Sequence, residues 1–423
     1  MKTKLLKLLA PDEVPYLRRD AVDADTLREA AKIVDDVRER GEEALYEHGL
    51  RLGDIQHGEP AIYEREQLEA ALEELPDEQR GVLERTAERI EAFCKAQRDA
   101  ITDVDVPIPG GRAGHTVVPV DRAGCYAPGG RFPLPSSVLM TACTARVAGV
   151  ETVWVASPKP DQVTLAAAAV AGADALLGIG GAQAIAAMAY GAGEVPACDV
   201  VVGPGNRWVT AAKKLVSGRV RIDMLAGPSE LVVFADHTAD PVTVAADLLA
   251  QAEHDPDALP ILISLDKALV KAVDDELVRQ LDILPTKETA SAALENGFAV
   301  IAESVEQGID LCDRIAAEHL EVIVEDAAQV ADKVNHYGGL FVGHGTAEVL
   351  GDYGAGPNHT LPTGGTARST GGLSVFTFLR VRTWMEMDDL EASQELVDDA
   401  IALARLEGLE GHARSAERRK LDE

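Results

Sequence analysis

Apolar residues recur every three or four positions through most of the first hundred residues, which is typical of amphipathic helices. This spacing predicts one helix over residues 26–40 and another over residues 64–98, each with charged residues on the opposite face. Thr26 with Glu29 three residues later fits a capping box, and Gly41 interrupts the pattern after the first helix. We interpret this region as a helical extension without chemistry of its own.

From residue 115 the pattern changes to short β-branched runs that alternate with alanine-rich helical stretches. Strand, helix and strand at this spacing predict parallel βαβ units with right-handed crossovers. The first series of strands is predicted at 116–120, 152–156, 175–179, 199–202 and 219–222. The second series is predicted at 231–235, 261–265, 299–302, 320–324 and 339–342. We therefore predict an α/β fold of two Rossmann-like parallel-sheet domains, with helical extensions at both ends.

The composition narrows the class of protein. The 423 residues include 71 acidic and 40 basic side chains, which gives a formal net charge of −31, and 46% of the residues are hydrophobic. Such a chain is globular, and it lacks the basic face that nucleic acid or an anionic membrane requires. Lysine is scarce, and the carboxylates are spread along the whole chain. Because this composition suits solubility in high salt, we expect a salt-adapted, halophilic host.

The five cysteines are odd in number, widely spaced and without any CxxC pair. They favour free thiols in a reducing cytosol over disulfides or a thiolate zinc site. The first nine residues are too short for a signal peptide and lack a cleavage site. Glycine, proline or charged residues break the longest apolar stretches, so none is expected to span a bilayer. These features predict a cytoplasmic protein.

Three glycine-rich turns follow predicted strands of the first series, at 124–130, 178–183 and 203–206. The middle turn is not a dinucleotide fingerprint, because Gln183 stands where GxGxxG requires its third glycine. Each turn allows close backbone approach, and the middle one opens a helix whose N-terminus could hold an anion. A plain turn explains each of them individually. Together they favour ligand binding at the carboxyl edge of this sheet.

Two pairs of polar residues near predicted helix ends could carry chemistry. Gln251 and His254 lie one turn apart on the same face of a predicted helix. Glu318 and His319 form an adjacent pair that offers two proton acceptors, with intrinsic pKa values of about 4.3 and about 6.5. From the pattern alone, a histidine that stabilises the helix C-terminus is the simpler interpretation of both pairs.

Four further polar residues lie in less regular regions. Asp352 and His359 occur in a stretch at 343–372 that is rich in glycine and threonine, and a loop of this length is usually functional. Glu407 and His412 occur in a polar helix predicted at about 390–419. Solvated surface is the simpler interpretation of these two residues from the pattern alone.

Seven runs of residues are specific as an ordered set. They are Tyr-Ala-Pro-Gly-Gly at 126–130, Gly-Gly-Ala-Gln-Ala-Ile at 180–185, Val-Gly-Pro-Gly-Asn at 202–206, Ile-Asp-Met-Leu-Ala-Gly-Pro-Ser-Glu at 222–230, Asp-Leu-Leu-Ala-Gln-Ala-Glu-His at 247–254, Ala-Glu-His-Leu-Glu at 317–321 and Asn-His-Thr-Leu-Pro-Thr at 358–363. Together they resemble the histidinol dehydrogenase family, zinc enzymes that complete histidine biosynthesis, over nearly the whole chain. The resemblance implies an N-terminal extension at 1–20, a first α/β domain at 21–125 and 229–373, a second at 126–228 and a C-terminal helical segment at 374–423.

The resemblance also implies functional residues. The positions that match the family's zinc ligands are Gln251, His254, Asp352 and His412. Those that match its acid–base pair are Glu318 and His319. Its substrate-contacting positions match Ser229, Gln251, His254, His319, Asp352, His359, Glu407 and His412. Its cofactor-contacting positions match Tyr126, Gln183 and Asn206.

The reaction that the resemblance implies is oxidation of L-histidinol by two NAD to L-histidine, through bound L-histidinal. Zinc would hold the substrate, His319 would take the alcohol proton, and Glu318 would activate water to attack the aldehyde. The resemblance further implies a homodimer with shared active sites, in which Glu407 and His412 reach the site of the other subunit.

Three alternatives are open at this point. A related zinc and NAD dehydrogenase of another small alcohol is one, although Ser229, His359 and Glu407 favour histidinol. A zinc hydrolase with Glu318 as its base is another, but this interpretation gives the three glycine-rich turns no function. The third is a non-catalytic dimeric scaffold, which the intact candidate ligands and His319 make the weakest interpretation.

Overall fold

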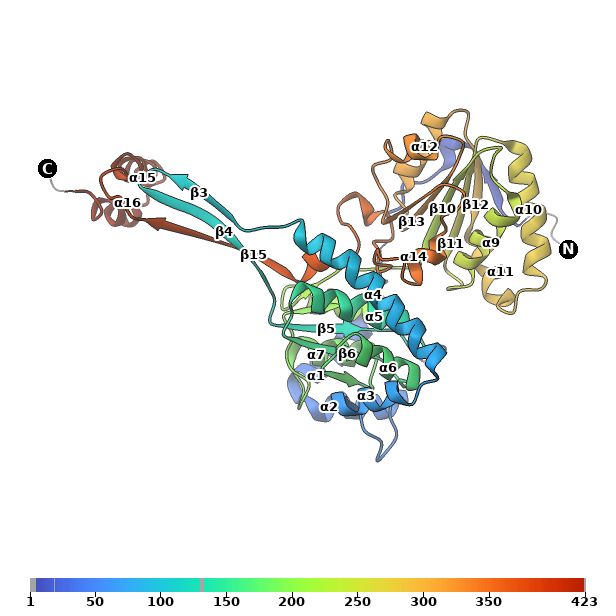
Figure 1. Ribbon diagram of the computed structural model, residues 1–423, viewed down its shortest axis with the longest axis horizontal. Coiled ribbons are helices and arrows are strands. Elements are labelled where there is room, and N and C mark those ends of the chain that lie inside the picture. Colours follow the sequence, from blue (N-terminus) through green and yellow to red (C-terminus); the bar gives the residue numbers. More distant parts are fainter. Residues whose placement is uncertain (1–4, 19, 130–132, 422–423) are drawn as a thin grey trace. The chain divides into compact units, whose positions relative to one another are not determined.

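The computed structural model describes residues 5–18, 20–129 and 133–421. Packing divides the chain into two units, Met1–Lys95 with Val120–Phe378, and Ala96–Pro119 with Leu379–Glu423. In the described residues, the first unit holds two six-stranded sheets and the second holds a three-stranded sheet (Figure 1). The two large sheets are called the first and second sheet below, in chain order.

The first sheet has the order β2-β7-β6-β5-β8-β9, with β2 antiparallel to β7 and the other pairs parallel. Its strands are β2 (Ile62–Glu64), β5 (Arg122–Tyr126), β6 (Thr152–Ala156), β7 (Ala175–Leu177), β8 (Val200–Val202) and β9 (Arg221–Ile222). The helices that connect them are α5 (Pro135–Ala148), α6 (Gln162–Val170), α7 (Gly181–Tyr190) and α8 (Arg207–Val216). All residues of β7 and β8 are buried, as expected for parallel strands covered by helices.

The second sheet is entirely parallel and has the order β1-β12-β11-β10-β13-β14. Its strands are β1 (Lys7–Leu9), β10 (Glu230–Ala235), β11 (Leu259–Ser264), β12 (Phe298–Ile301), β13 (His319–Ile323) and β14 (Gly339–Val342). Its helices are α9 (Pro241–Ala252), α10 (Lys267–Leu281), α11 (Lys287–Asn296), α12 (Val305–Ile315), α13 (Ala327–Ala331) and α14 (Glu348–Asp352). Without β1 and β2, both sheets have the strand order 3-2-1-4-5, which is the Rossmann order without its sixth strand and confirms the predicted fold class.

The N-terminal helices form largely as predicted. They are α1 (Ala24–Arg40), α2 (Glu42–Leu52), α3 (Arg65–Glu73) and α4 (Asp77–Asp99). Gly41, with φ 61°, separates α1 from α2. The cap of α1 differs from the prediction, because Asp23 accepts from the backbone N–H of Asp25 and Thr26 and places Thr26 inside the helix. The single helix predicted at 64–98 is two helices, since Pro76 cannot continue the helix that precedes it.

The N-terminal helices α1 and α2 pack on the first sheet, which differs from the expected grouping of residues 21–125 with 229–373. Val34, Val37 and Leu45 share one core cluster with Ile179 and Ile185. Strand β2 also joins this sheet, through β7. The apolar faces of α1 and α2 become buried only when the two helices pack against this core. Strand β1, from the expected N-terminal extension, instead pairs with β12 of the second sheet.

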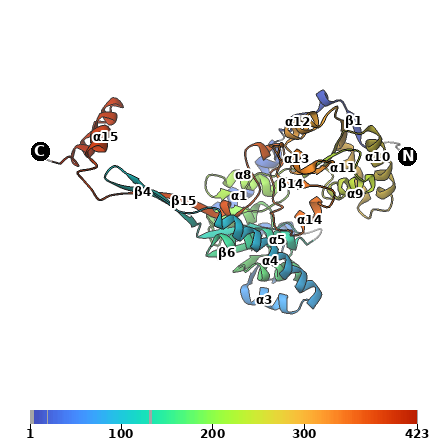
Figure 2. The ribbon, with the colours of Figure 1, turned by 45° about the horizontal axis from the view of Figure 1, so that its top comes forward.

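The second unit contains three antiparallel strands in the order β15-β4-β3, side by side in both views, and two helices (Figures 1 and 2). These elements are β3 (Val104–Ile108), β4 (Gly111–Pro119), β15 (Leu379–Met387), α15 (Gln394–Leu406) and α16 (Glu410–Glu417). The parallel strand predicted at 116–120 is therefore wrong, because those residues end β4, which pairs antiparallel with β15. The helix predicted at 390–419 breaks at Gly408, whose φ is 76°.

Three short 3-10 turns complete the elements in the described residues. They are η1 (Pro11–Glu13), η2 (Thr366–Arg368) and η3 (Val375–Phe378). The stretch at 343–372, predicted without periodic structure, thus contains α14 and η2. In the part of the chain that the structure describes, no helix has the length and apolar character needed to cross a membrane.

Candidate active site

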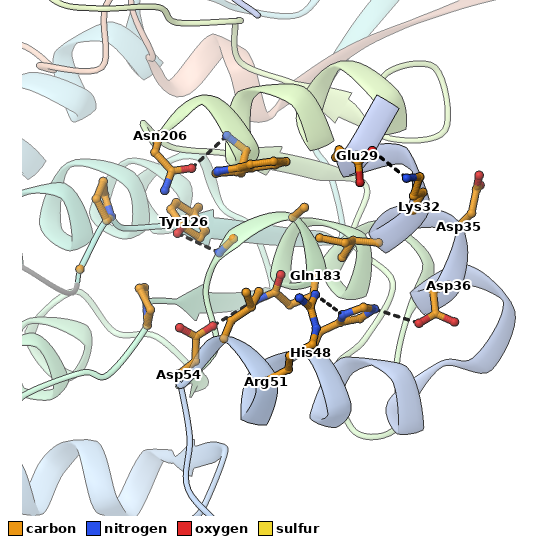
Figure 3. Close-up of a pocket in the computed structure, with 18 of the residues that line it drawn as sticks. Glu29, Lys32, Asp35, Asp36, His48, Arg51, Asp54, Tyr126, Gln183 and Asn206 are labelled. Atoms are coloured by element: carbon orange, nitrogen blue, oxygen red, sulfur yellow. Dashed lines mark hydrogen bonds and ion pairs between the residues drawn. The ribbon is translucent and has the colours of Figure 1, made fainter. Parts of the chain in front are cut away.

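The carboxyl edge of the first sheet carries an open pocket of ≈ 960 Å³ (Figure 3). Tyr126 is the last residue of β5, Gln183 lies in the first turn of α7, and Asn206 caps α8. All three side chains line the pocket. The structure therefore brings the three expected cofactor contacts together at one sheet edge. Gly130, at the end of the first glycine-rich turn, lies outside the described residues.

Tyr126 and Asn206 are held by helix N-termini. The hydroxyl of Tyr126 accepts from the backbone N–H of Gly181 at 3.1 Å, and burial raises the pKa of this phenol to about 12. Asn206 Oδ1 accepts from the backbone N–H groups of Trp208 and Val209, at 3.0 and 3.3 Å, so that its Nδ2 is the end left for another partner. Both side chains thus enter the pocket with one polar group already fixed.

A buried ion pair holds the turn that precedes Asn206. Lys213 pairs with Asp223, and both side chains are almost fully removed from solvent. Lys213 Nζ donates to the carbonyl of Gly203 at 2.9 Å, while Asp223 Oδ2 accepts from the N–H of Gly203 at 2.8 Å. Gly203 has a φ of 117°, and a Cβ there would lie 2.0 Å from the carbonyl oxygen of Tyr126. The glycine is therefore required by both conformation and space.

A second group of polar residues gathers at the amino edge of the second sheet. Ser229 immediately precedes β10, and the Glu318–His319 pair stands at the start of β13. Ser229 Oγ donates to Glu318 Oε2 at 2.5 Å, and the backbone N–H of Glu230 donates to the same oxygen at 3.1 Å. Burial nevertheless raises the pKa of Glu318 well above the usual carboxyl range. A carboxylate with a raised pKa is a stronger proton acceptor than one in water.

His319 is buried beside Gln251 and Glu348. Its Nδ1 lies 3.3 Å from Gln251 Oε1 and 3.3 Å from Glu348 Oε1. Its Nε2 is buried and has no hydrogen-bond partner among the described residues. Burial lowers the pKa of this imidazole to about 3, so the ring is neutral at pH 7. A neutral imidazole with one free nitrogen can accept a proton from a ligand.

The expected metal ligands of the first unit converge next to His319. His254, Glu348 and Asp352 each offer a ligand atom within 4.8 Å of the others, and His254 Nε2 lies 3.9 Å from Asp352 Oδ2. Gln251 lies beside this group, with its oxygen 3.3 Å from His319 Nδ1 and its amide nitrogen buried without a hydrogen-bond partner in the described chain. One nitrogen and several oxygens fit a borderline cation such as Zn²⁺.

Glu348 is a residue that sequence reasoning missed. It lies one helical turn before Asp352 in α14, and burial raises its pKa well above the usual carboxyl range. Beneath it, Glu321 Oε1 accepts from the N–H of Glu348 at 2.8 Å. Burial raises the pKa of Glu321 to about 8 and that of its neighbour Asp247 to about 6. The four-residue spacing of Glu348 and Asp352 was the available signal, but the sequence does not show that Glu348 is buried and Asp352 half-buried.

The remaining expected substrate residues fall into two groups. His359 Nδ1 lies 3.0 Å from the carbonyl oxygen of Asp352, and its Nε2 lies 3.3 Å from Ser137 Oγ. His359 therefore lies beside the group formed by His254, Glu348 and Asp352, which is called the metal-competent cluster below. Burial lowers the pKa of His359. Glu407 follows α15 and His412 lies in α16, both in the second unit. Their participation in the site stays a prediction.

The fold and the site define a class: an α/β enzyme with two Rossmann-like sheets, a cofactor-sized pocket on one and a buried acid–histidine cluster on the other. The family model for histidinol dehydrogenase matches residues 17–420. A histidinol dehydrogenase of Thermus thermophilus is 47% identical over 96% of this chain and 97% of the relative. One of Halobacterium salinarum is 44% identical over 98% of both chains. The chain belongs to the histidinol dehydrogenase family, whose members are oxidoreductases.

The fold agrees with this assignment. The crystal structure of histidinol dehydrogenase from Elizabethkingia anophelis superimposes with a TM-score of 0.91, at 30% sequence identity, over 98% of both chains. Membership in an oxidoreductase family disfavours the hydrolase and scaffold alternatives considered from the sequence.

Proposed function

We propose that this protein oxidises L-histidinol to L-histidine in two NAD-dependent steps, with L-histidinal held between them. The observation that carries the proposal is the Glu318–His319 pair. It sets a neutral imidazole with a free, buried Nε2 next to a carboxylate of raised pKa, beside the metal-competent cluster. Family membership supports the choice of histidinol.

His319 and Glu318 have different roles in the two oxidations. In the first, His319 accepts the hydroxyl proton while a hydride leaves the carbinol carbon and an aldehyde forms. In the second, Glu318 accepts a proton from water as its oxygen attacks the aldehyde carbon. The resulting hydrate then loses a hydride to NAD while His319 accepts its hydroxyl proton, which gives the carboxylate. Burial of both groups limits escape of the reactive aldehyde.

Two bound groups complete the chemistry that we propose. Zn²⁺ would fix the substrate and supply Lewis-acid chemistry, and NAD would serve as the hydride acceptor. Gln251, His254 and Asp352, with His412, would hold the metal. Tyr126, Gln183 and Asn206 would contact the cofactor, through the polar ends that remain inside the pocket.

The stoichiometry of product formation tests this function. Purified enzyme should yield two NADH for each L-histidinol consumed, with about one zinc per subunit by metal analysis. One NADH per alcohol with accumulation of aldehyde would show a simple alcohol dehydrogenase. A turnover without NADH would exclude the nicotinamide chemistry altogether.

We further propose a cytoplasmic homodimer in which Glu407 and His412 complete the partner subunit's active site. The free, buried state of all five cysteines supports a reducing compartment. Mixing inactive Gln251→Ala and inactive His412→Ala subunits tests the shared site. Each mixed dimer would regain one intact site, so random exchange should restore about one quarter of wild-type activity. No recovery in dimers shown to exchange would place His412 in its own subunit's site.

A further inference from the structure

Asp54 enters the pocket of the first sheet from a part of the chain in which the sequence showed no chemistry. It follows α2, whose left-handed cap residue Gly53 turns the chain toward the N-terminus of α7. Asp54 Oδ2 accepts from the backbone N–H of Gly180 at 3.0 Å and from Gln183 Nε2 at 3.0 Å (Figure 3). One carboxylate oxygen thus binds both the start of α7 and an expected cofactor contact.

The Asp54 carboxylate fixes the orientation of the Gln183 amide, whose nitrogen donates to it. Because a carboxylate only accepts hydrogen bonds, the amide nitrogen must point to Asp54 and the amide oxygen must point away. Gln183 is 1% exposed, and its Oε1 has no hydrogen-bond partner in the described residues. A Cβ at Gly181 would lie 3.0 Å from this oxygen, so the glycine leaves space beside it. A buried acceptor without a partner is costly unless a ligand donates to it.

The same carboxylate changes what the N-terminus of α7 can bind. In a Rossmann dinucleotide site, the cofactor's pyrophosphate sits on the N–H groups at this place. Here the N–H of Gly180 is bound by Asp54 and that of Gly181 by the Tyr126 hydroxyl. The negative charge of Asp54 already occupies the positive N-terminal end of α7. This end therefore repels a phosphate, and the ligand group that fits beside it is an uncharged hydrogen-bond donor.

We propose that Asp54 is a positioning residue that holds Gln183 so that Oε1 accepts a hydrogen bond from a hydroxyl or amide of the dinucleotide, and that it keeps the dinucleotide's phosphates away from α7. This proposal rests on the proposed binding of NAD in this pocket. It also gives a physical reason for the missing third glycine, because the protein's own carboxylate replaces the phosphate at the helix N-terminus.

NADH binding without substrate, followed by nucleotide fluorescence, tests the proposal in a double-mutant cycle. Asp54→Ala and Gln183→Ala should each weaken binding by about tenfold, the effect of one lost hydrogen bond to a ligand. If Asp54 acts through Gln183, the double variant should bind no more weakly than Gln183→Ala, within about twofold. Wild-type affinity in Asp54→Ala, or losses that multiply in the double variant, would overturn the proposal.

Asp161→Ala provides the matched control. Asp161 caps α6 of the same sheet through the N–H and hydroxyl of Thr164, at 2.9 and 2.7 Å, and does not line the pocket. Loss of this cap should lower the melting temperature and leave NADH affinity unchanged. An equal loss of affinity in Asp161→Ala would show that Asp54 acts only through stability.

Asp54→Asn tests the charge separately, because asparagine keeps the size of the side chain. Removal of the negative charge should let inorganic pyrophosphate compete with NADH several-fold more strongly than it does in the wild type. Unchanged competition would refute the repulsion of phosphate. Failure of the wild-type protein to bind NADH would instead refute the proposed cofactor, and the two results are therefore distinguishable.

Discussion

The two large sheets share one strand order but present their functional residues at opposite edges. On the first sheet, Tyr126 ends β5, Gln183 follows β7 and Asn206 follows β8, so these pocket residues lie at the carboxyl edge. On the second sheet, Ser229 precedes β10 and His319 begins β13, so the acid–histidine cluster lies at the amino edge. Similar folding has therefore produced two chemically different sites.

The polarity of the helices explains the difference. Helices of a βαβ unit run against the strands, so their N-termini gather at the carboxyl edge and their C-termini at the amino edge. The carboxyl edge offers N–H donors, which Asp54 and Tyr126 already use at α7. The amino edge offers carbonyl ends and negative potential, and Gln251 and His254 lie at the end of α9. The second edge therefore suits a cation, whereas at α7 of the first edge the Asp54 carboxylate already takes the place of an anion.

The largest expected effect comes from the proposed catalytic pair, Glu318 and His319, at the amino edge. His319→Asn should lower both oxidations by about 10²–10⁴-fold, because the proton acceptor is lost while its size is nearly kept. Zinc content and NADH affinity should stay at wild-type values, since neither site loses a ligand. Steady-state assays with L-histidinol and with L-histidinal, together with metal analysis, measure these effects.

Glu318→Gln serves as the matched variant, since it should slow oxidation of supplied L-histidinal more than oxidation of the alcohol. A Glu318→Gln enzyme that oxidises the aldehyde at the wild-type rate would show that another group activates water.

A smaller effect is expected from the buried ion pair at the carboxyl edge. Lys213→Met leaves Asp223 charged, buried and unpaired, which should cost about 3–5 kcal/mol of unfolding free energy. The doubly uncharged Lys213→Met/Asp223→Asn protein should recover most of that stability. Urea denaturation of the three proteins measures the difference. A loss below about 1 kcal/mol in Lys213→Met would mean that water reaches the pair and weakens its role.

The sequence predicted the parallel strands well, because their apolar runs are continuous and glycine-rich turns follow them. It failed for β15, whose pairing with β4 joins residues hundreds of positions apart. It also missed the neighbouring β3, whose side chains are mostly exposed, so that it lacks an apolar run. It failed again for the packing of α1 and α2, because the pattern of an amphipathic helix does not indicate which sheet its apolar face covers. These misses concern long-range pairing, which local periodicity does not encode.

The candidate site was predictable only in part. Periodicity alone favoured a dipole-stabilising role for His254 and His319, and their chemical role came from the family resemblance. Glu348 and Asp54 were missed because their burial and partners depend on tertiary packing. The roles of Glu407 and His412 and the salt-adapted host stay predictions.

The smallest expected effect is the change in NADH affinity when the metal is removed, and it tests whether the two edges act independently. Removal of the metal with a zinc chelator should abolish turnover, and added Zn²⁺ should restore it. NADH affinity should change by no more than about twofold, because the described pocket lining shares no residue with the acid–histidine cluster. The reverse variant, Gln183→Ala, should lose NADH affinity and keep its zinc. A tenfold loss of NADH affinity on chelation would show that the two sites are coupled, and helix polarity would no longer be sufficient to explain their separation.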